Sequence, residues 1–198
     1  MKTRSVLILF FLFTVCKLSY ATRSLIWNEG SIVLSDKTVL TGDISIEAHH
    51  DLVLLRMDGK VDVYPAHRIS SLYYFDAAAN INRKFVALAD ASDGVQFFHL
   101  YEIVLKGEVD VLRRLKPLTV ELYADANDFD YFIRRDEKLL RLDKFRRKIY
   151  PDLLKRSGIL LSIYVRENKL DPNDAASAIQ IVEYFNRLQK EGAVIARH

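Results

Sequence analysis

Apolar and polar residues alternate most regularly between Val95 and Arg114, in the run VQFFHLYEIVLKGEVDVLRR. A period of two is typical of a β-strand with two different faces. Gly107 interrupts the run where a tight turn needs a permissive backbone, and residues 109–115 continue in the return direction. The pattern predicts a β-hairpin at the structural centre of the chain.

Similar but shorter segments surround this hairpin, each bounded by turn residues. They cover residues 30–34, 42–47, 51–57, 60–64, 70–76 and 83–89, with one helical turn or bend expected at 65–69. Asp58-Gly59 is the strongest of the turn signals. A weaker strand is expected at 119–123, and a last hairpin over 129–142. Many short strands joined by tight turns predict an antiparallel β-barrel or sandwich-like domain.

The period changes from two to 3.6 after Leu142. Phe145, Ile149 and Leu153 share one stripe of a helix that Gly158 should end and that Pro151 can interrupt. A second helix is expected over 159–169, and a third begins at Asp171-Pro172 and runs to about residue 191. The predicted fold is therefore α+β: an antiparallel β domain over residues 22–142 and a three-helix C-terminal subdomain over 143–198.

Residues 1–21 are expected to be a secretory signal peptide. A cationic start precedes the apolar run Val6 to Cys16, and Ser19-Tyr20-Ala21 forms a small-x-small cleavage site. The apolar run is too short for a membrane span, and no later segment is long and apolar enough for one. A lipoprotein interpretation of Cys16 conflicts with Val15, which is not small. The chain is expected to be exported and either periplasmic or secreted.

Removing the signal peptide changes the net charge of the chain. The full sequence has 29 Lys+Arg and 26 Asp+Glu, and the signal contains three basic residues and no acid. The mature chain is then neutral and offers no case for nucleic-acid binding. Its only cysteine, Cys16, leaves as well, so disulfides and thiolate chemistry are excluded from the mature chain.

Several segments resemble a group of exported, uncharacterised proteins of Bacteroidetes-type bacteria, and the resemblance rests on their order. The segments are WNEGSIVL (27–34), GDISI (42–46), YPAHRISSLYYFD (64–76), RKFVAL (83–88), FFHLYEIVLKGEVDVLRR (97–114), DKFRRKIYPDLL (143–154) and IVEYFN (181–186). The resemblance implies export and a β domain followed by a helical tail. It implies no activity, cofactor or site residue.

Two short motifs have the residue types of metal sites. His49-His50 lies in a turn near Glu47 and Asp51, but adjacent histidines diverge in an extended chain and no third ligand follows by spacing. The acidic loop 125–130 fails the EF-hand pattern, with Phe129, Asp130 and Asp136 at positions five, six and twelve. A solvated turn and a polar loop are the simpler interpretations, and no metal, cofactor or catalytic residue is assigned.

One segment has a marked excess of positive charge. Residues 134–158 contain ten basic and four acidic residues. The predicted partner-binding residues are Arg134, Arg135, Arg141, Lys144, Arg146, Arg147 and Lys148. Such a patch can bind an acidic partner or anionic envelope lipid, although the exposed faces of a hairpin and a helix would show the same composition.

Three functions remain open on the sequence. The leading one is a non-catalytic envelope or secreted protein that binds an unknown protein or envelope component. A small apolar ligand carrier is the first alternative and requires a cavity lined by residues such as Phe97, Tyr101 and Ile103. A hydrolase with a non-standard site is the second, because no G-x-S-x-G or H-E-x-x-H motif is present. It requires a histidine beside a carboxylate.

Overall fold

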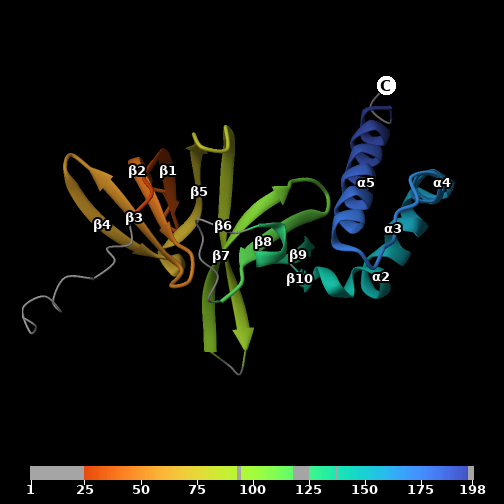
Figure 1. The fold of residues 1–198 in the computed structure, drawn as a ribbon, viewed down its shortest axis with the longest axis horizontal. Coiled ribbons are helices and arrows are strands. Elements are labelled where there is room, and N and C mark those ends of the chain that lie inside the picture. Colours follow the sequence, from red (N-terminus) through yellow and green to blue (C-terminus); the bar gives the residue numbers. More distant parts are fainter. Residues whose placement is uncertain (1–24, 93–94, 118–124, 137, 196–198) are drawn as a thin grey trace, which may run out of the picture.

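Antiparallel strands and C-terminal helices occupy opposite ends of an elongated α+β molecule (Figure 1). The structure is a computed structural model that describes residues 25–92, 95–117, 125–136 and 138–195. The expected signal peptide, Cys16 and the expected strand at 119–123 lie outside these residues. The predicted α+β class is confirmed.

Ten strands form a single antiparallel sheet in the order β10-β9-β8-β7-β6-β5-β1-β2-β3-β4. Their bounds are β1 Asn28–Leu34, β2 Val39–Glu47, β3 Leu52–Met57, β4 Lys60–Pro65, β5 Ile69–Asp76, β6 Ile81–Ser92, β7 Val95–Leu105, β8 Asp110–Leu115, β9 Phe129–Arg135 and β10 Lys138–Arg141. The predicted central hairpin is confirmed as β7–β8, and the last hairpin as β9–β10. A 3-10 turn, η1 (Ala66–Arg68), stands where one helical turn was expected.

The sheet is not closed, so the barrel is not confirmed. β4 and β10 are the two ends of the strand order, and they do not pair with each other in the described part of the chain. Between β4 and β5 the chain crosses from one end of the first four strands back to β1, which pairs with both β2 and β5. Two meanders are therefore joined side by side in one open sheet.

The first meander and β5–β7 enclose the first apolar core. Their inward-facing residues are almost completely buried, and the core comprises Ile32, Leu34, Ile44, Val53, Leu55, Ala66, Ile69, Leu72, Tyr74 and Leu100. β-branched and leucine side chains at alternate positions dominate, as expected for a strand with one buried face.

Four α-helices follow the sheet within the described residues, one more than predicted. They are α2 (Phe145–Lys148), α3 (Tyr150–Ser157), α4 (Ile159–Glu167) and α5 (Ala175–Ile195), and the 3-10 turn η4 (Leu142–Lys144) precedes them. The first predicted helix is split into α2 and α3 at Ile149, just before Pro151. Proline has no N–H to donate and its ring displaces the preceding backbone, which explains the break.

The start of α5 also differs from the sequence prediction. The N–H and hydroxyl of Ser177 donate to Asp174 Oδ2 at 2.8 and 2.9 Å, so Asp174 caps the helix. Asp171, the predicted cap, instead accepts the Asn173 N–H at 2.9 Å. Both aspartates suit an N-terminal cap, and the sequence alone favoured the wrong one because proline follows Asp171.

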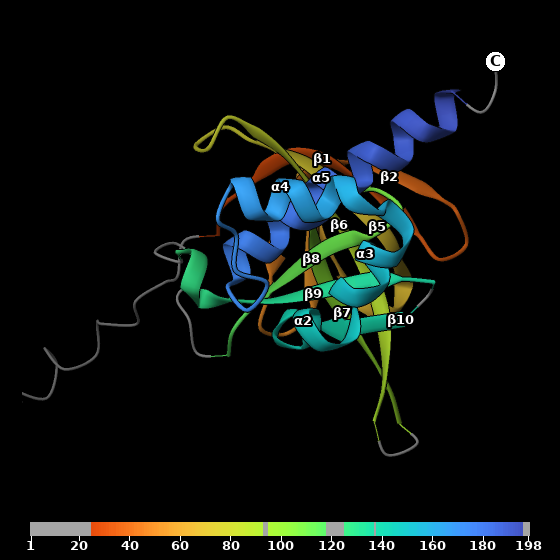
Figure 2. The same ribbon diagram turned by 90° about the vertical axis from the view of Figure 1, so that its right-hand side faces the viewer.

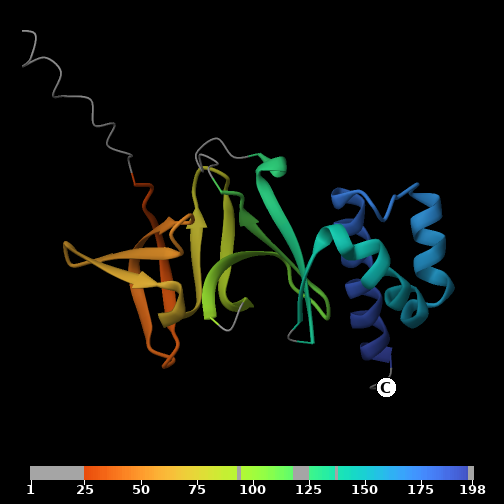
Figure 3. The ribbon, with the colours of Figure 1, turned by 90° about the horizontal axis from the view of Figure 1, so that it is seen from below.

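The second core lies between the helices and the last strands (Figures 2 and 3). It contains Val109, Val111, Ile133, Leu142, Phe145, Ile149, Leu153, Leu161, Ala178, Ile181, Val182 and Phe185. The predicted stripe of Phe145, Ile149 and Leu153 is buried in it. Since strand and helix side chains share this core, the helices depend on β8 and β9 for their packing.

Candidate functional site

Asp51 joins distant parts of the described sheet through three side-chain hydrogen bonds. It lies in the β2–β3 turn with a φ of 53°. Its Oδ2 accepts from His99 Nδ1 at 2.8 Å and from Arg114 Nη2 at 2.9 Å, and its Oδ1 accepts the Leu100 N–H at 2.8 Å. We call Asp51, His99 and Arg114 the Asp51 cluster.

The position of the Asp51 cluster follows from the strand register. β8 is paired with β7 at Glu102↔Arg113 and beyond, but not at Leu100. The Leu100 N–H therefore needs another acceptor, and Asp51 provides it. The Asp51 carbonyl also accepts the Ala66 N–H at 2.9 Å. Asp51 thus ties the start of η1 and the β2–β3 turn to the exposed side of β7.

The Asp51–His99 pair satisfies the first requirement of the hydrolase alternative. A carboxylate on Nδ1 orients an imidazole and leaves Nε2 as the base. A hollow of about 350 Å³ adjoins Arg114 and is lined by Ala48, His49, Arg114, Leu115 and Pro117. This lining offers no hydroxyl or thiol nucleophile. Since Arg114 also pairs with Asp51, we interpret the cluster as a structural link.

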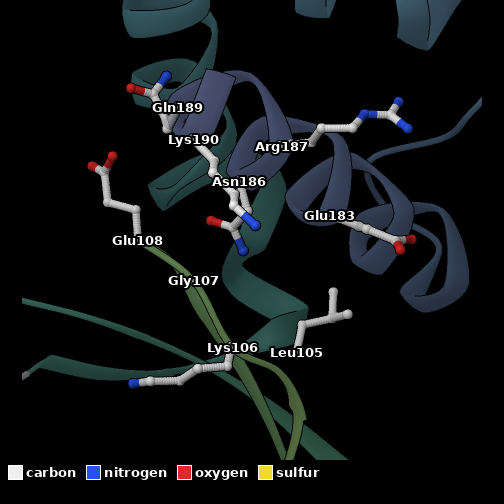
Figure 4. A pocket seen from close by; sticks show the side chains of 9 residues that line it. All are labelled: Leu105, Lys106, Gly107, Glu108, Glu183, Asn186, Arg187, Gln189 and Lys190. Carbon is white, nitrogen blue, oxygen red and sulfur yellow. The ribbon is translucent and has the colours of Figure 1, made fainter. Parts of the chain in front are cut away.

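The larger hollow, about 640 Å³, lies between the β7–β8 turn and α5 (Figure 4). Asn186 of α5 spans its floor: its Oδ1 accepts the Val109 N–H at 3.0 Å and its Nδ2 donates to the Val109 carbonyl at 2.8 Å. The rim of the hollow has charges of both signs, contributed by Lys106, Glu108, Glu183, Arg187 and Lys190. The hollow is open and mixed in charge, and its central polar group already has its partners.

Internal carboxylates neutralise much of the predicted basic segment. Arg134 binds Asp110 through Nε at 3.0 Å and Nη2 at 2.6 Å. Arg135 binds Asp152, and Arg141 lies 3.3 Å from Asp130. Two of these three acids, Asp110 and Asp130, come from outside residues 134–158, so the local excess of charge in the sequence overstates the excess in space.

The remaining basic residues of the segment are more exposed. Lys144 lies 3.9 Å from Asp143, and Arg146 donates to Asn173 Oδ1 at 3.4 Å. Arg147 and Lys148 of α2 are exposed and form no ion pair within the described residues. The predicted partner-binding role stays a prediction, and these two residues are where it would be strongest.

The short metal-like motifs do not assemble a ligand set. The described residues contain no group of three or more His, Cys, Asp or Glu side chains placed to hold a metal ion. His50 Nδ1 lies 3.9 Å from Glu47 at the surface. In the acidic loop, Asp125 and Asp128 form a reciprocal capping box around the 3-10 turn η3 (Ala126–Asp128), so their carboxylates already accept backbone N–H groups.

β4 is one of the two edge strands of the described sheet. β4 lies at the end of the molecule opposite the helices (Figure 1), and among the described strands it pairs only with β3. Lys60, Val61, Asp62 and Val63 are all exposed, with Val61 and Val63 at 47% and 53% of their full accessibility. The unpaired N–H and C=O groups of a free edge can pair with another strand, and Val61 and Val63 add exposed apolar side chains to this edge.

Register decides which β4 backbone groups are free. Asp58 and Gly59, with φ of 49° and 77°, form the two-residue turn between Met57 and Lys60. Because the Ala66 N–H donates to the carbonyl of Asp51, the residue just before β3, the even-numbered residues of β4 direct their backbone groups toward β3. Val61 and Val63 therefore direct theirs outward.

Sequence reasoning missed both the Asp51 cluster and the free edge. His99 is 48 residues from Asp51, and Arg114 is 63 residues from it, so no spacing signal connects them. Lys60 to Tyr64 was predicted as a strand, but strand order, which makes it an edge, is a property of the whole sheet.

Membrane and family comparisons add two findings. Within the described residues, none of the helices combines the length and the apolar character needed to cross a bilayer. Comparison of the chain with protein-family models, curated proteins and solved structures finds no match. The likeness to exported Bacteroidetes-type proteins stays a prediction.

Proposed function

We propose that this chain is an exported, non-catalytic binding protein that receives an extended segment of a partner protein along the open edge of β4. One observation carries the proposal: Val61 and Val63 are exposed and present outward-directed backbone groups on a strand that has a described neighbour on one side only. Strand addition uses these groups for affinity and the alternating side chains for specificity.

The rest of the molecule supports a scaffold for that edge. β3 and β4 are held to the sheet by the first core, and the Asp51 cluster fixes the β2–β3 turn. A rigid edge loses little conformational entropy when it binds an extended segment. Export, by cleavage after Ala21, would place this edge in the periplasm or outside the cell.

Neither alternative function has comparable support. In the carrier alternative, Phe97 should line an internal cavity, but its side chain is 51% exposed, whereas Tyr101 is buried and packs edge-on against Phe132 at 5.1 Å. Both described hollows are open and lie outside the first core. The hydrolase alternative retains the His99–Asp51 pair and lacks a nucleophile in the adjoining hollow.

Site-specific photo-cross-linking in the host cell tests the proposal. A benzoylphenylalanine placed at Val63 should give protein adducts, whereas the same residue at Ile159, which is 71% exposed at the helical end, should not. Val61→Pro should abolish the adducts at position 63, because it removes an outward N–H donor. Since that donor does not face β3, the substitution should change the melting temperature little.

Two results would contradict the proposal: equal adduct yields from positions 63 and 159, or adducts at position 63 that persist in the Val61→Pro background. The identity of the adduct is a separate matter, because a hetero-adduct and a self-adduct both support strand addition at β4.

A further inference from the structure

The β4 edge is complementary to itself in charge, because Lys60 and Asp62 lie on either side of Val61. We infer that two copies of this chain pair through antiparallel β4 strands related by a two-fold axis at Val61. This inference rests on the proposed use of the edge and names the partner as a second copy of the chain. A two-fold interface brings the same patch of both copies together.

Backbone direction restricts the allowed registers. The outward groups belong to odd-numbered residues, so an added antiparallel strand must place its own outward residues opposite Val61 or Val63. Three self-pairings meet this condition: Val61 opposite Val61, Val61 opposite Val63, and Val63 opposite Val63.

The charges of Lys60 and Asp62 and the position of Pro65 then favour one of the three registers. With Val61 opposite Val61, Lys60 of each copy faces Asp62 of the other, so two opposite-charge pairs form. With Val61 opposite Val63, the two Asp62 carboxylates face each other, and like charges directly opposite are unfavourable. With Val63 opposite Val63, Val61 faces Pro65, which has no N–H to donate. The first register is the only one of the three that places neither like charges nor a proline opposite an outward residue.

The chosen register also covers the exposed side chains of Val61 and Val63. Val61 meets its symmetry mate, and Val63 lies opposite the Asp58-Gly59 turn of the second copy. Lys60 and Asp62 lie on the opposite face. Both valines, which are about half exposed in the single chain, lose water-accessible surface in the pair.

The shape of the molecule permits this arrangement. β4 lies at one end and the helices lie at the other (Figure 3). Pairing two β4 strands would extend the sheet through both copies and place the two helical ends far apart. The helices therefore leave the edge accessible to a second copy.

Charge reversal combined with sedimentation velocity tests the inference on the purified chain from residue 22 to 198. Lys60→Glu and Asp62→Lys should each raise the dimer dissociation constant about tenfold or more, because each converts two attractive cross-strand pairs into repulsive ones. The double variant restores opposite charges and should recover most of the affinity. Lys138→Glu, on the exposed strand β10 at the other end of the sheet, is the matched control and should have no effect.

Cysteine cross-linking tests the register independently, since residues 22–198 contain no cysteine. Under mild oxidation Val61→Cys should form a covalent dimer, because the Cα atoms of a hydrogen-bonded antiparallel pair lie about 5.5 Å apart. Val63→Cys should not, because the two thiols at position 63 would be offset by four residues along the strands, about 14 Å.

The outcomes separate this inference from the proposed function. A chain that stays monomeric to about 100 μM, a dimer indifferent to both single reversals, or efficient cross-linking at position 63 instead of 61 would overturn the inference. Hetero-adducts from position 63 in cells would then still support strand addition to β4. Absence of adducts together with a monomeric chain would overturn both.

Discussion

Asp51 links three elements because its backbone and its side chain are both constrained. A φ of 53° is uncommon for a residue other than glycine, although Asp and Asn tolerate it better than most. That conformation directs the carboxylate toward β7 and β8, where it accepts from the Leu100 N–H, His99 and Arg114. Asp51 is 14% exposed at its side chain, so its partners are hard for water to replace.

Asp51→Asn should lower the free energy of unfolding by about 2 kcal/mol, because it removes the charge that holds Arg114 and His99 while keeping a residue that tolerates positive φ. Urea denaturation at pH 7 measures the change. Asp58→Asn is the matched control: Asp58 also has a positive φ of 49°, but it is an exposed turn residue, and its change should stay within about 0.5 kcal/mol. Equal losses in the two variants would show that the Asp51 contacts contribute nothing.

The β7–β8 hairpin joins the sheet to the helices. Asn186 of α5 binds both backbone groups of Val109, and a Cβ built on Gly107 would lie 2.3 Å from the Asn186 side chain. Gly107 is therefore required here for close approach. The sequence assigned the same glycine to the turn, which is correct in position, but it had no information about the helix that packs against it.

Gly107→Ala should destabilise the protein by about 1–3 kcal/mol, because the new methyl group forces Asn186 away from Val109. In the Asn186→Ala background the same substitution should cost much less, since the clashing side chain is gone. A double-mutant cycle by chemical denaturation measures this coupling. Gly192→Ala in α5, where a Cβ meets nothing within 4 Å, should stabilise by about 0.5–1 kcal/mol. If the stability losses of the two substitutions were simply additive in the cycle, the contact between Gly107 and Asn186 would be contradicted.

At the scale of the whole molecule, two cores share one sheet, and a chain of ion pairs crosses neighbouring strands of that sheet. Glu102 accepts from Arg83 at 2.7 Å and from Arg113 at 2.7 Å, and Arg83 also binds Asp76 at 2.7 Å. These partly buried pairs run from β5 to β8, and the Glu102–Arg113 pair joins a strand of the first core to a strand that supports the helices. Removing one partner would leave the other charge poorly solvated, so the network favours the intact pairing of β5 to β8.

Acid should weaken the whole molecule through several aspartates. Burial alone would raise the pKa of Asp110, but hydrogen bonds from Lys106, the Gly107 N–H and Arg134 outweigh it and hold that pKa below its usual value. The pKa of Asp76 is lowered in the same way, with burial outweighed by Arg83 and the Ala79 N–H. A lowered pKa in the folded state means that the stabilisation is complete above the unfolded carboxyl range, near pH 5, and is lost as pH falls from there through the lower pKa of the folded state.

Asp110→Asn should therefore reduce stability at pH 7 and flatten the loss of stability between about pH 5 and pH 3. Urea midpoints across this range measure the effect, with Asp58→Asn as the exposed control. A variant whose stability falls with acid as steeply as that of the parent chain would contradict the contribution of Asp110.

Local elements follow from the sequence alone. Alternation identified the β7–β8 hairpin, Asp58-Gly59 marked the turn that the structure contains, and the stripe of Phe145, Ile149 and Leu153 identified a buried helical face. These features depend on neighbours within a few residues, and so the periodicity of the chain records them. The division of the first helix at Pro151 has the same local cause.

The folded structure was needed to establish which strands are neighbours, where the sheet stays open and which charges are neutralised. Arg134 meets Asp110, and Asp51 meets Arg114, across 24 and 63 residues. β4 becomes a free edge because β5 returns to pair with β1. Each of these outcomes depends on the burial of apolar faces against distant elements, a global balance that no short stretch of sequence records.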